Sequence, residues 1–248
     1  MSLIVWILIF TLIGCIGAIL GASFILFFPA VRLKALISPL VSYATGTLLG
    51  SAFLGMLPKA LQRSSPLSIS GTVLVGILLF FLLEKLVIWR HCHEEACEIH
   101  TRAGPLTLFG DAFHNFVDGV VIASGFLTDI SLGVATAVSV FAHELPQEIG
   151  DFAILLESGY TRRKAFIYNL LSQATSLLGA VIAYIYLKAI QAAVPYVLAL
   201  SAASFIYIAL ADLIPGLQRN RQGKGNLLQF GLVLAGIGTI LLFLLHHG

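Results

Sequence analysis

The sequence predicts an all-α polytopic membrane protein with about eight transmembrane helices. Of the 248 residues, 58% are apolar and only 10% are charged, and the mean hydropathy is +0.98. Soluble globular domains carry about 25% charged residues, so these values exclude that class. The net charge of +2 is also too small to indicate a nucleic-acid partner, and the expected surroundings are a lipid bilayer.

Apolar segments of roughly 20 residues or more, long enough to cross a bilayer, follow one another along the chain. The first is expected to be a true span rather than a signal peptide, because it is long and no charged residue precedes Arg32. Little chain remains between spans, so residues 1–248 are expected to form one transporter domain with a hydrophilic loop at 91–103. The predicted spans are 3–28, 36–61, 67–89, 106–127, 130–156, 165–187, 192–217 and 227–245.

The distribution of Lys and Arg predicts the orientation, because these residues accumulate in cytoplasmic loops. Most basic residues fall in the loops on one side of the predicted bundle. The other side, which also carries both termini, holds only Lys59, Arg63 and Lys188. Both termini should therefore lie outside the cytoplasm. The loops after the first, third, fifth and seventh spans, with the adjoining span ends, hold 11 of the 14 basic residues: Arg32, Lys34, Lys85, Arg90, Arg102, Arg162, Arg163, Lys164, Arg219, Arg221 and Lys224.

A faint internal repeat relates the second and seventh spans. Residues 47–58 (TLLGSAFLGMLP) resemble residues 204–215 (SFIYIALADLIP). By the charge count the two copies cross the membrane in opposite directions, which is typical of the inverted repeats of secondary transporters. Two unrelated apolar helices that each end at a Pro would explain the pattern equally well.

Two neighbouring spans carry ionisable residues on one helical face each. Positions three or four apart share a face, and a charged group at membrane depth costs ~3 to more than ~10 kcal/mol unless it is paired, hydrated or metal-bound. The two faces are therefore expected to meet in one functional site. The fourth span contributes Asp111, His114, Asn115 and Asp118, and the fifth contributes His143, Glu144, Gln147, Glu148 and Asp151.

These donor groups favour a divalent metal ion. Imidazole, carboxylate and amide oxygen are ligands for Zn²⁺, Fe²⁺, Mn²⁺ or Co²⁺, and neither segment contains the Cys or Met that Cu⁺ prefers. Pro146 has no N–H for the carbonyl of Ala142, so it is expected to open the helix there. Pairing of these side chains among themselves to hold the helices together, or a proton relay, remains the alternative.

The two segments, H-N-x-x-D-G at 114–119 and H-E-x-P-x-E-x-G-D at 143–151, resemble the signature of the ZIP (Zrt/Irt-like) family of divalent metal transporters. The second motif is similar to that of one subgroup. Residues 44–50, 80–85 and 205–215 also look like family blocks, so the resemblance covers nearly the whole chain. It implies eight spans with both termini outside, and import of zinc or a similar ion (Fe, Mn, Co or Cd) across a cell membrane without any further cofactor. A homodimer is also an expectation.

The resemblance further implies a two-metal centre between the fourth and fifth spans. One subsite would use His114, Asp118, His143 and Gln147, and the other would use Asn115, Glu144 and Glu148, with Asp118 as a bridge. Asp111, Asp151 and Gln173 are accessory candidates. The chain departs from the family pattern at Gln147, where the subgroup usually has His, at Ser51 and Gly55 in the second span, and in the sixth span, where Gln173 and Ser176 occur without a carboxylate.

The loop between the third and fourth spans is rich in metal ligands. The loop is expected on the cytoplasmic side, where its thiols stay reduced. It could therefore accept an ion that leaves the membrane. Members of the family that the chain resembles also have His-rich segments at this place. A merely solvated loop is the alternative. Its candidate ligands are His91, Cys92, His93, Cys97 and His100.

Two other functions stay open. His143-Glu144 begins like the H-E-x-x-H motif of zinc proteases, so an intramembrane metal-dependent hydrolase is the first alternative; however, residue 147 is Gln, and Pro146 distorts the one-turn spacing. A proton-driven carrier of an organic solute is the second, although neither segment has an Arg or Lys to hold an anionic group. The sequence therefore predicts a transporter rather than an enzyme.

Overall fold

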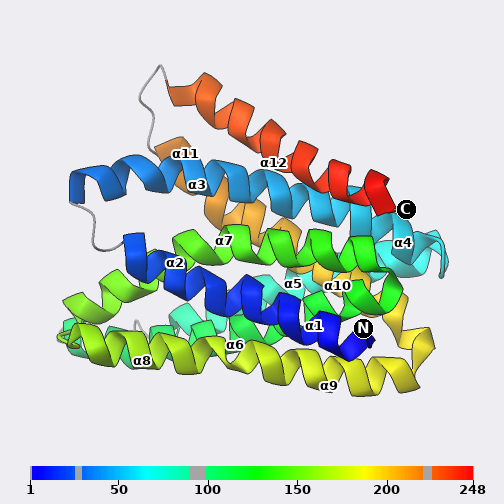
Figure 1. Ribbon diagram of the computed structural model, residues 1–248, viewed down its shortest axis with the longest axis horizontal. Coiled ribbons are helices and arrows are strands. Elements are labelled where there is room, and N and C mark those ends of the chain that lie inside the picture. Colours follow the sequence, from blue (N-terminus) through cyan, green and yellow to red (C-terminus); the bar gives the residue numbers. More distant parts are fainter. Residues whose placement is uncertain (1, 26–29, 90–98, 220–224, 248) are drawn as a thin grey trace.

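The computed structural model describes residues 2–25, 30–89, 99–219 and 225–247, apart from some side chains, mostly near the ends of these ranges. Within them the backbone forms eight helical rods and no strand. The rods lie along a common direction, and both chain ends lie at the same end of the bundle (Figure 1).

The first two rods each contain a π-helical segment. The first rod joins α1 (Leu3–Thr11), η1 (Leu12–Ile16) and α2 (Gly17–Ile25), and the second joins α3 (Ala30–Gly50), η2 (Ser51–Met56) and α4 (Leu57–Leu61). The next three rods are the single helices α5 (Pro66–Trp89), α6 (Ile99–Thr128) and α7 (Ile130–Glu157).

The sixth rod is interrupted once, at Ala174, and the seventh is again interrupted. The sixth joins α8 (Arg162–Gln173) to α9 (Thr175–Ala189). The seventh joins η3 (Gln191–Ala193), α10 (Val194–Tyr207), η4 (Ile208–Leu213) and α11 (Ile214–Arg219), and the eighth is α12 (Gly225–His247). Each of the eight predicted spans corresponds to one rod, although α6 begins seven residues before the predicted position.

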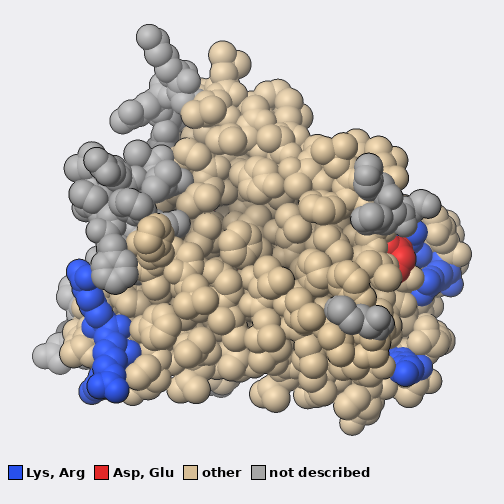
Figure 2. Space-filling model, viewed as in Figure 1, with Lys and Arg blue, Asp and Glu red and all other residues tan. Residues whose placement is uncertain are grey.

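The all-α polytopic membrane fold is confirmed. Among the described residues, six rods are long and apolar enough to cross a membrane. The two that fall short are α6 and α7, because their polar residues lower the apolar content. In the face that Figure 2 shows, Lys and Arg side chains gather at the two ends, and the broad middle carries other residues. This belt is the surface expected of a bundle whose sides contact lipid.

Two of the π-helical segments lie at matching positions of the predicted internal repeat. Segment η2 starts four residues after Thr47, and η4 starts four residues after Ser204, so both occupy the same place in the two similar stretches. A π segment adds a residue to one helical turn, is uncommon, and is frequently found at functional sites. The coincidence supports an internal repeat, while the opposite orientation of its copies stays a prediction.

Glycines bring two pairs of rods into close contact. Where α6 packs on α9, a Cβ at Gly119 would overlap the carbonyl of Ser176, and a Cβ at Gly179 would overlap the carbonyl of Phe116. Where α3 packs on α12, a Cβ at Gly46 would likewise overlap the carbonyl of Val233. Lipid tails are as apolar as the helices, so close backbone packing is a main source of helix association in a bilayer.

A single residue, Asp129, joins α6 to α7 and sets their relative position. Its Oδ1 accepts hydrogen bonds from the backbone N–H of Leu132 and from the hydroxyl of Ser131, both at 2.7 Å, and so caps α7. Its Oδ2 lies 2.9 Å from Nζ of Lys59 in α4. Partial burial raises the pKa of the Asp129 carboxyl, but these hydrogen bonds and Lys59 outweigh it and lower the pKa below its usual value.

We expect Gly119→Ala to destabilise the protein, because its methyl group has no room against α9. Overpacking of this kind typically costs about 1–3 kcal/mol. Thermal unfolding in detergent measures the effect. Gly110→Ala on the same helix is the matched control: nothing lies within 4 Å of its added Cβ, so it should be neutral or slightly stabilising. Equal melting temperatures for the two variants would contradict the close α6–α9 contact.

We expect Asp129→Ala to lose about 1–2 kcal/mol at neutral pH, because the cap of α7 and the Lys59 contact disappear together. Since the folded-state pKa is lowered, this stability is fully present above the unfolded pKa of about 3.9 and is lost as the pH falls through the folded pKa. The melting temperatures of parent and variant should therefore differ at pH 7 and converge below about pH 4. A difference independent of pH would show that the ionised carboxylate contributes nothing.

Candidate metal centre

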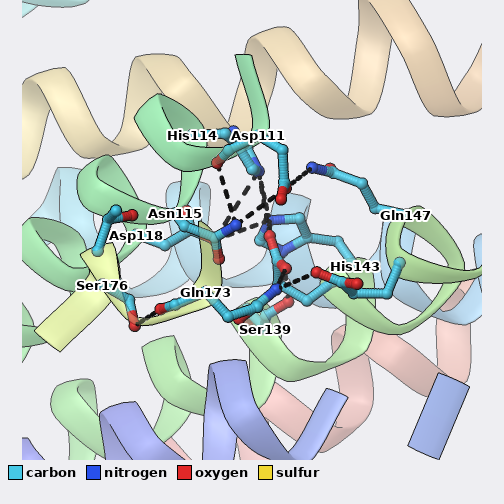
Figure 3. Close-up of polar contacts among 12 residues, drawn as sticks. Asp111, His114, Asn115, Asp118, Ser139, His143, Gln147, Gln173 and Ser176 are labelled. Atoms are coloured by element: carbon cyan, nitrogen blue, oxygen red, sulfur yellow. Dashed lines mark hydrogen bonds and ion pairs between the residues drawn. The ribbon is translucent and has the colours of Figure 1, made fainter. Parts of the chain in front are cut away.

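The polar faces of α6 and α7 meet inside the bundle, as predicted. Asp111, Asn115 and Asp118 on α6 are buried, as are His143, Glu144 and Glu148 on α7. His114 keeps 21% of its side chain exposed. Figure 3 shows Asp111, His114 and Asn115 of α6 close to His143 and Gln147 of α7, with α8 and α9 contributing Gln173 and Ser176. The result is a cluster of carboxylates and imidazoles in a core whose other buried residues, among those described, are apolar or uncharged.

Four side chains turn their ligand atoms toward one point. Nε2 of His114 and Nε2 of His143 lie 3.2 Å apart. Oδ2 of Asp118 lies 3.2 Å from the His143 nitrogen and 3.8 Å from that of His114, and Oε1 of Glu144 lies 3.4 Å from the His114 nitrogen. These four ligand atoms all lie within 4.8 Å of one another.

This spacing fits a tetrahedral metal site. Zinc binds nitrogen and carboxylate oxygen at about 2.0–2.2 Å, which places neighbouring tetrahedral ligands about 3.3–3.6 Å apart. Five of the six separations between these ligand atoms lie between 3.2 and 3.9 Å, close to this range. Two imidazoles and two carboxylates are also a suitable ligand set for Zn²⁺ and for other divalent ions of the first transition row.

The backbone of α7 orients His143. Its Nδ1 lies 2.9 Å from the carbonyl oxygen of Ser139, one turn earlier, so Nδ1–H donates to that oxygen and Nε2 keeps its lone pair for the cluster. The hydroxyl of Ser139 lies 2.6 Å from that of Ser51 in η2 and also donates to the carbonyl of Thr47. Sequence reasoning did not identify Ser139, although its position four residues before His143 is the signal that could have done so.

A second acidic group lies next to the first. Carboxylate oxygens of Asp111, Glu144 and Glu148 also lie within 4.8 Å of one another. Three amides surround them. Nδ2 of Asn115 donates to Oδ1 of Asp111 at 2.9 Å, and Nε2 of Gln147 lies 3.4 Å from the same oxygen.

The third amide, Gln173, lies between two of these carboxylates. Its Nε2 donates to Oε2 of Glu144 and, at 2.5 Å, to Oε1 of Glu148. In the described part of the chain no donor reaches Oε1 of Gln173 or Oδ1 of Asn115, although both atoms are buried. Such unpaired buried acceptors call for a partner such as a water molecule or a cation.

A cavity of about 250 Å³ extends from the cluster. His143, Pro146 and Gln147 line it on one side, and Ser38 and Asp212 are among the residues on the other. Residues of α3 and α11 also line the cavity, and α11 lies at the end of the bundle away from the chain termini (Figure 1). Asp212 of η4 is far from His143 in the sequence, but the tertiary structure brings both residues to the same cavity.

The prediction about Pro146 was only partly right. Helix α7 runs without interruption from Ile130 to Glu157, with Pro146 inside it. Packing of α7 against α3 and α6 keeps the helix continuous, so the effect of the proline is limited to the hydrogen bond that it cannot donate.

The remaining candidates lie apart from the cluster or beyond what the structure describes. Asp151 belongs to neither group of ligand atoms and is partly exposed. The side chains of the proposed loop ligands, His91, Cys92, His93, Cys97 and His100, lie outside the described residues.

Comparisons with known proteins all point to zinc transporters. A family model described as ZIP zinc transporter matches residues 90–244. Zinc transporter ZIP13 of Pongo abelii is 33% identical over 219 residues, which cover 82% of this chain and 66% of that protein. Zinc transporter foi of Drosophila melanogaster is 38% identical over 144 residues, or 58% of this chain.

The relatives are longer than this chain. The matched part is 20% of the Drosophila protein and 19% of zinc transporter ZIP6 of Homo sapiens, which is 36% identical over 143 residues. The chain therefore spans from about a fifth to two thirds of the curated relatives. The residues that the family model matches, 90–244, include α6 and α7.

Proposed function

Because the chain belongs to the ZIP zinc transporter family, we propose that it moves Zn²⁺ or a similar divalent cation across the membrane into the cytoplasm. The observation that carries the proposal is the convergence of His114, Asp118, His143 and Glu144 inside a membrane bundle. Such a cluster is costly at membrane depth unless it is paired, hydrated or bound to a cation, and its spacing suits a transition-metal ion.

We assign the primary subsite to His114, Asp118, His143 and Glu144. Glu144 replaces Gln147 in the set that the family resemblance implied, because its Oε1 lies 3.4 Å from the His114 nitrogen, whereas Gln147 is directed toward Asp111. Asn115 and Glu148 remain candidates for a second subsite beside it. Asp111 joins that subsite, since it is grouped with Glu144 and Glu148.

The cavity suggests how the ion leaves. If both termini lie outside the cell, as the charge distribution predicts, the cavity beside His143 extends toward the cytoplasm. On the other side of the cluster, the Ser51–Ser139 contact joins η2 to α7. A carrier must open its site to the two sides in turn, so this contact would have to separate when an ion enters from outside.

The other features predicted from the sequence complete the proposal. The protein would reside in a cell membrane with both termini outside and would form one transporter domain over residues 1–248. The loop at 91–103 would receive the ion on the cytoplasmic side. A homodimer remains an expectation. Nothing supports the intramembrane hydrolase, because the family consists of transporters and Gln147 takes the place of the second His in the protease motif.

We expect His143→Ala, and likewise His114→Ala, to abolish nearly all zinc flux into proteoliposomes that contain the purified protein. Loss of one direct ligand should weaken zinc binding at least about 100-fold, since even loss of a ligand's hydrogen-bond partner costs about 10–100-fold. Phe113→Ala is the matched control, because Phe113 neighbours His114 but has a 48% exposed side chain. A folded His143→Ala protein with parental flux would overturn the proposed function.

We expect Gln147→His to raise the affinity for Zn²⁺ more than for Mn²⁺. The imidazole nitrogen would replace an amide beside Asp111, and imidazole ligands favour zinc over manganese. Competition between the two ions in the flux assay measures the ratio. An unchanged ratio would mean that residue 147 does not approach the transported ion.

A further inference from the structure

Gln173 is a buried neutral side chain in the middle of the acidic cluster. Its exposed fraction is 0%. The amide nitrogen donates one hydrogen bond to Glu144 and another to Glu148, the latter at 2.5 Å. Both acceptors belong to the group of three carboxylates that could hold a second ion. The amide therefore occupies the gap between two of the three ligands.

The nitrogen, and not the oxygen, must face these carboxylates. An amide oxygen placed there would face two further acceptors with no proton between them, and amide orientation is decided by such neighbours. The NH₂ group supplies two donors, one for each carboxylate. The NH₂ group thereby satisfies the two acids in part as a cation would. Unlike the amide oxygen, it cannot bind a cation.

The backbone around Gln173 is held in place. Helix α8 ends at Gln173, and α9 begins at Thr175. The hydroxyl of Thr175 donates to the carbonyl of Ala112 in α6 at 2.6 Å, and the hydroxyl of Ser176 donates to the carbonyl of Gln173 at 2.7 Å. Gly119 and Gly179 bring α6 and α9 together at the same level. The break between α8 and α9 is therefore anchored to the helix that carries half of the site.

We propose that the Gln173 amide takes the place of a second cation and so limits the centre to one ion in each transport step. This inference rests on the proposed function. A second ion would have to displace both hydrogen bonds of the amide and would leave the NH₂ group facing a cation. The primary group of His114, Asp118, His143 and Glu144 stays free of this amide except at Oε2 of Glu144, so it can bind its ion through Oε1.

The number of bound ions tests the proposal. Equilibrium dialysis of the purified full chain against Zn²⁺, followed by metal analysis, should give about one ion per chain for the parent protein and about two for Gln173→Glu, which removes the donors and adds a carboxylate. Adding Glu148→Gln to Gln173→Glu should return the count to about one, because it removes a ligand of the second ion.

Each outcome is decisive. Two ions in the parent protein would overturn the inference and leave the proposed function intact, as would one ion in a folded Gln173→Glu protein. No bound ion in the parent protein would overturn the proposed function and, with it, the inference. If Gln173→Glu does not fold, Gln173→Ala also removes the amide and is judged by the same count: two ions support the proposal and one ion overturns it.

Discussion

The structure depends on the meeting of two polar helix faces in a core that has almost no other charge. Asp118, Glu144 and Glu148 are essentially inaccessible to solvent, and in an apolar medium each ionised carboxylate needs a partner. The two imidazoles and the surrounding amides provide partners only in part. A divalent cation, as proposed, would complete the set, and the same interaction would then account for the binding chemistry and for the interior position of α6 and α7.

The rest of the bundle keeps these two faces in register. Asp129 is the single residue between α6 and α7, and it holds the start of α7 in place because it caps α7 and contacts Lys59 of α4. Gly119 lets α9 approach α6 so closely that Gln173 reaches the acids of α7. Small residues are used here for backbone proximity, since a bilayer supplies no hydrophobic force between helices. The positions of the ligands thus follow from contacts outside the ligand set.

The two sides of the cluster differ physically. Toward one end of the bundle a cavity reaches His143. On the other side, hydroxyl groups of Ser51 and Ser139 contact each other directly. A π-helical segment begins at Ser51, and another begins at the matching position of the seventh rod. Extra residues in a helical turn loosen its hydrogen bonding, so the segments that border the site are the least regular parts of otherwise long helices.

The sequence by itself determined the eight spans, the class of the protein and nearly all of the cluster, because long apolar runs and the three-to-four spacing of Asp111, His114 and Asp118 are local properties. Only the tertiary structure decided which ligands face the same point. Glu144 joins His114, whereas Gln147 turns toward Asp111. It also brought Asp212 to the cavity and Gln173 between two acids. Helix rotation and close glycine contacts set these distances, and neither is encoded in the spacing along a single helix.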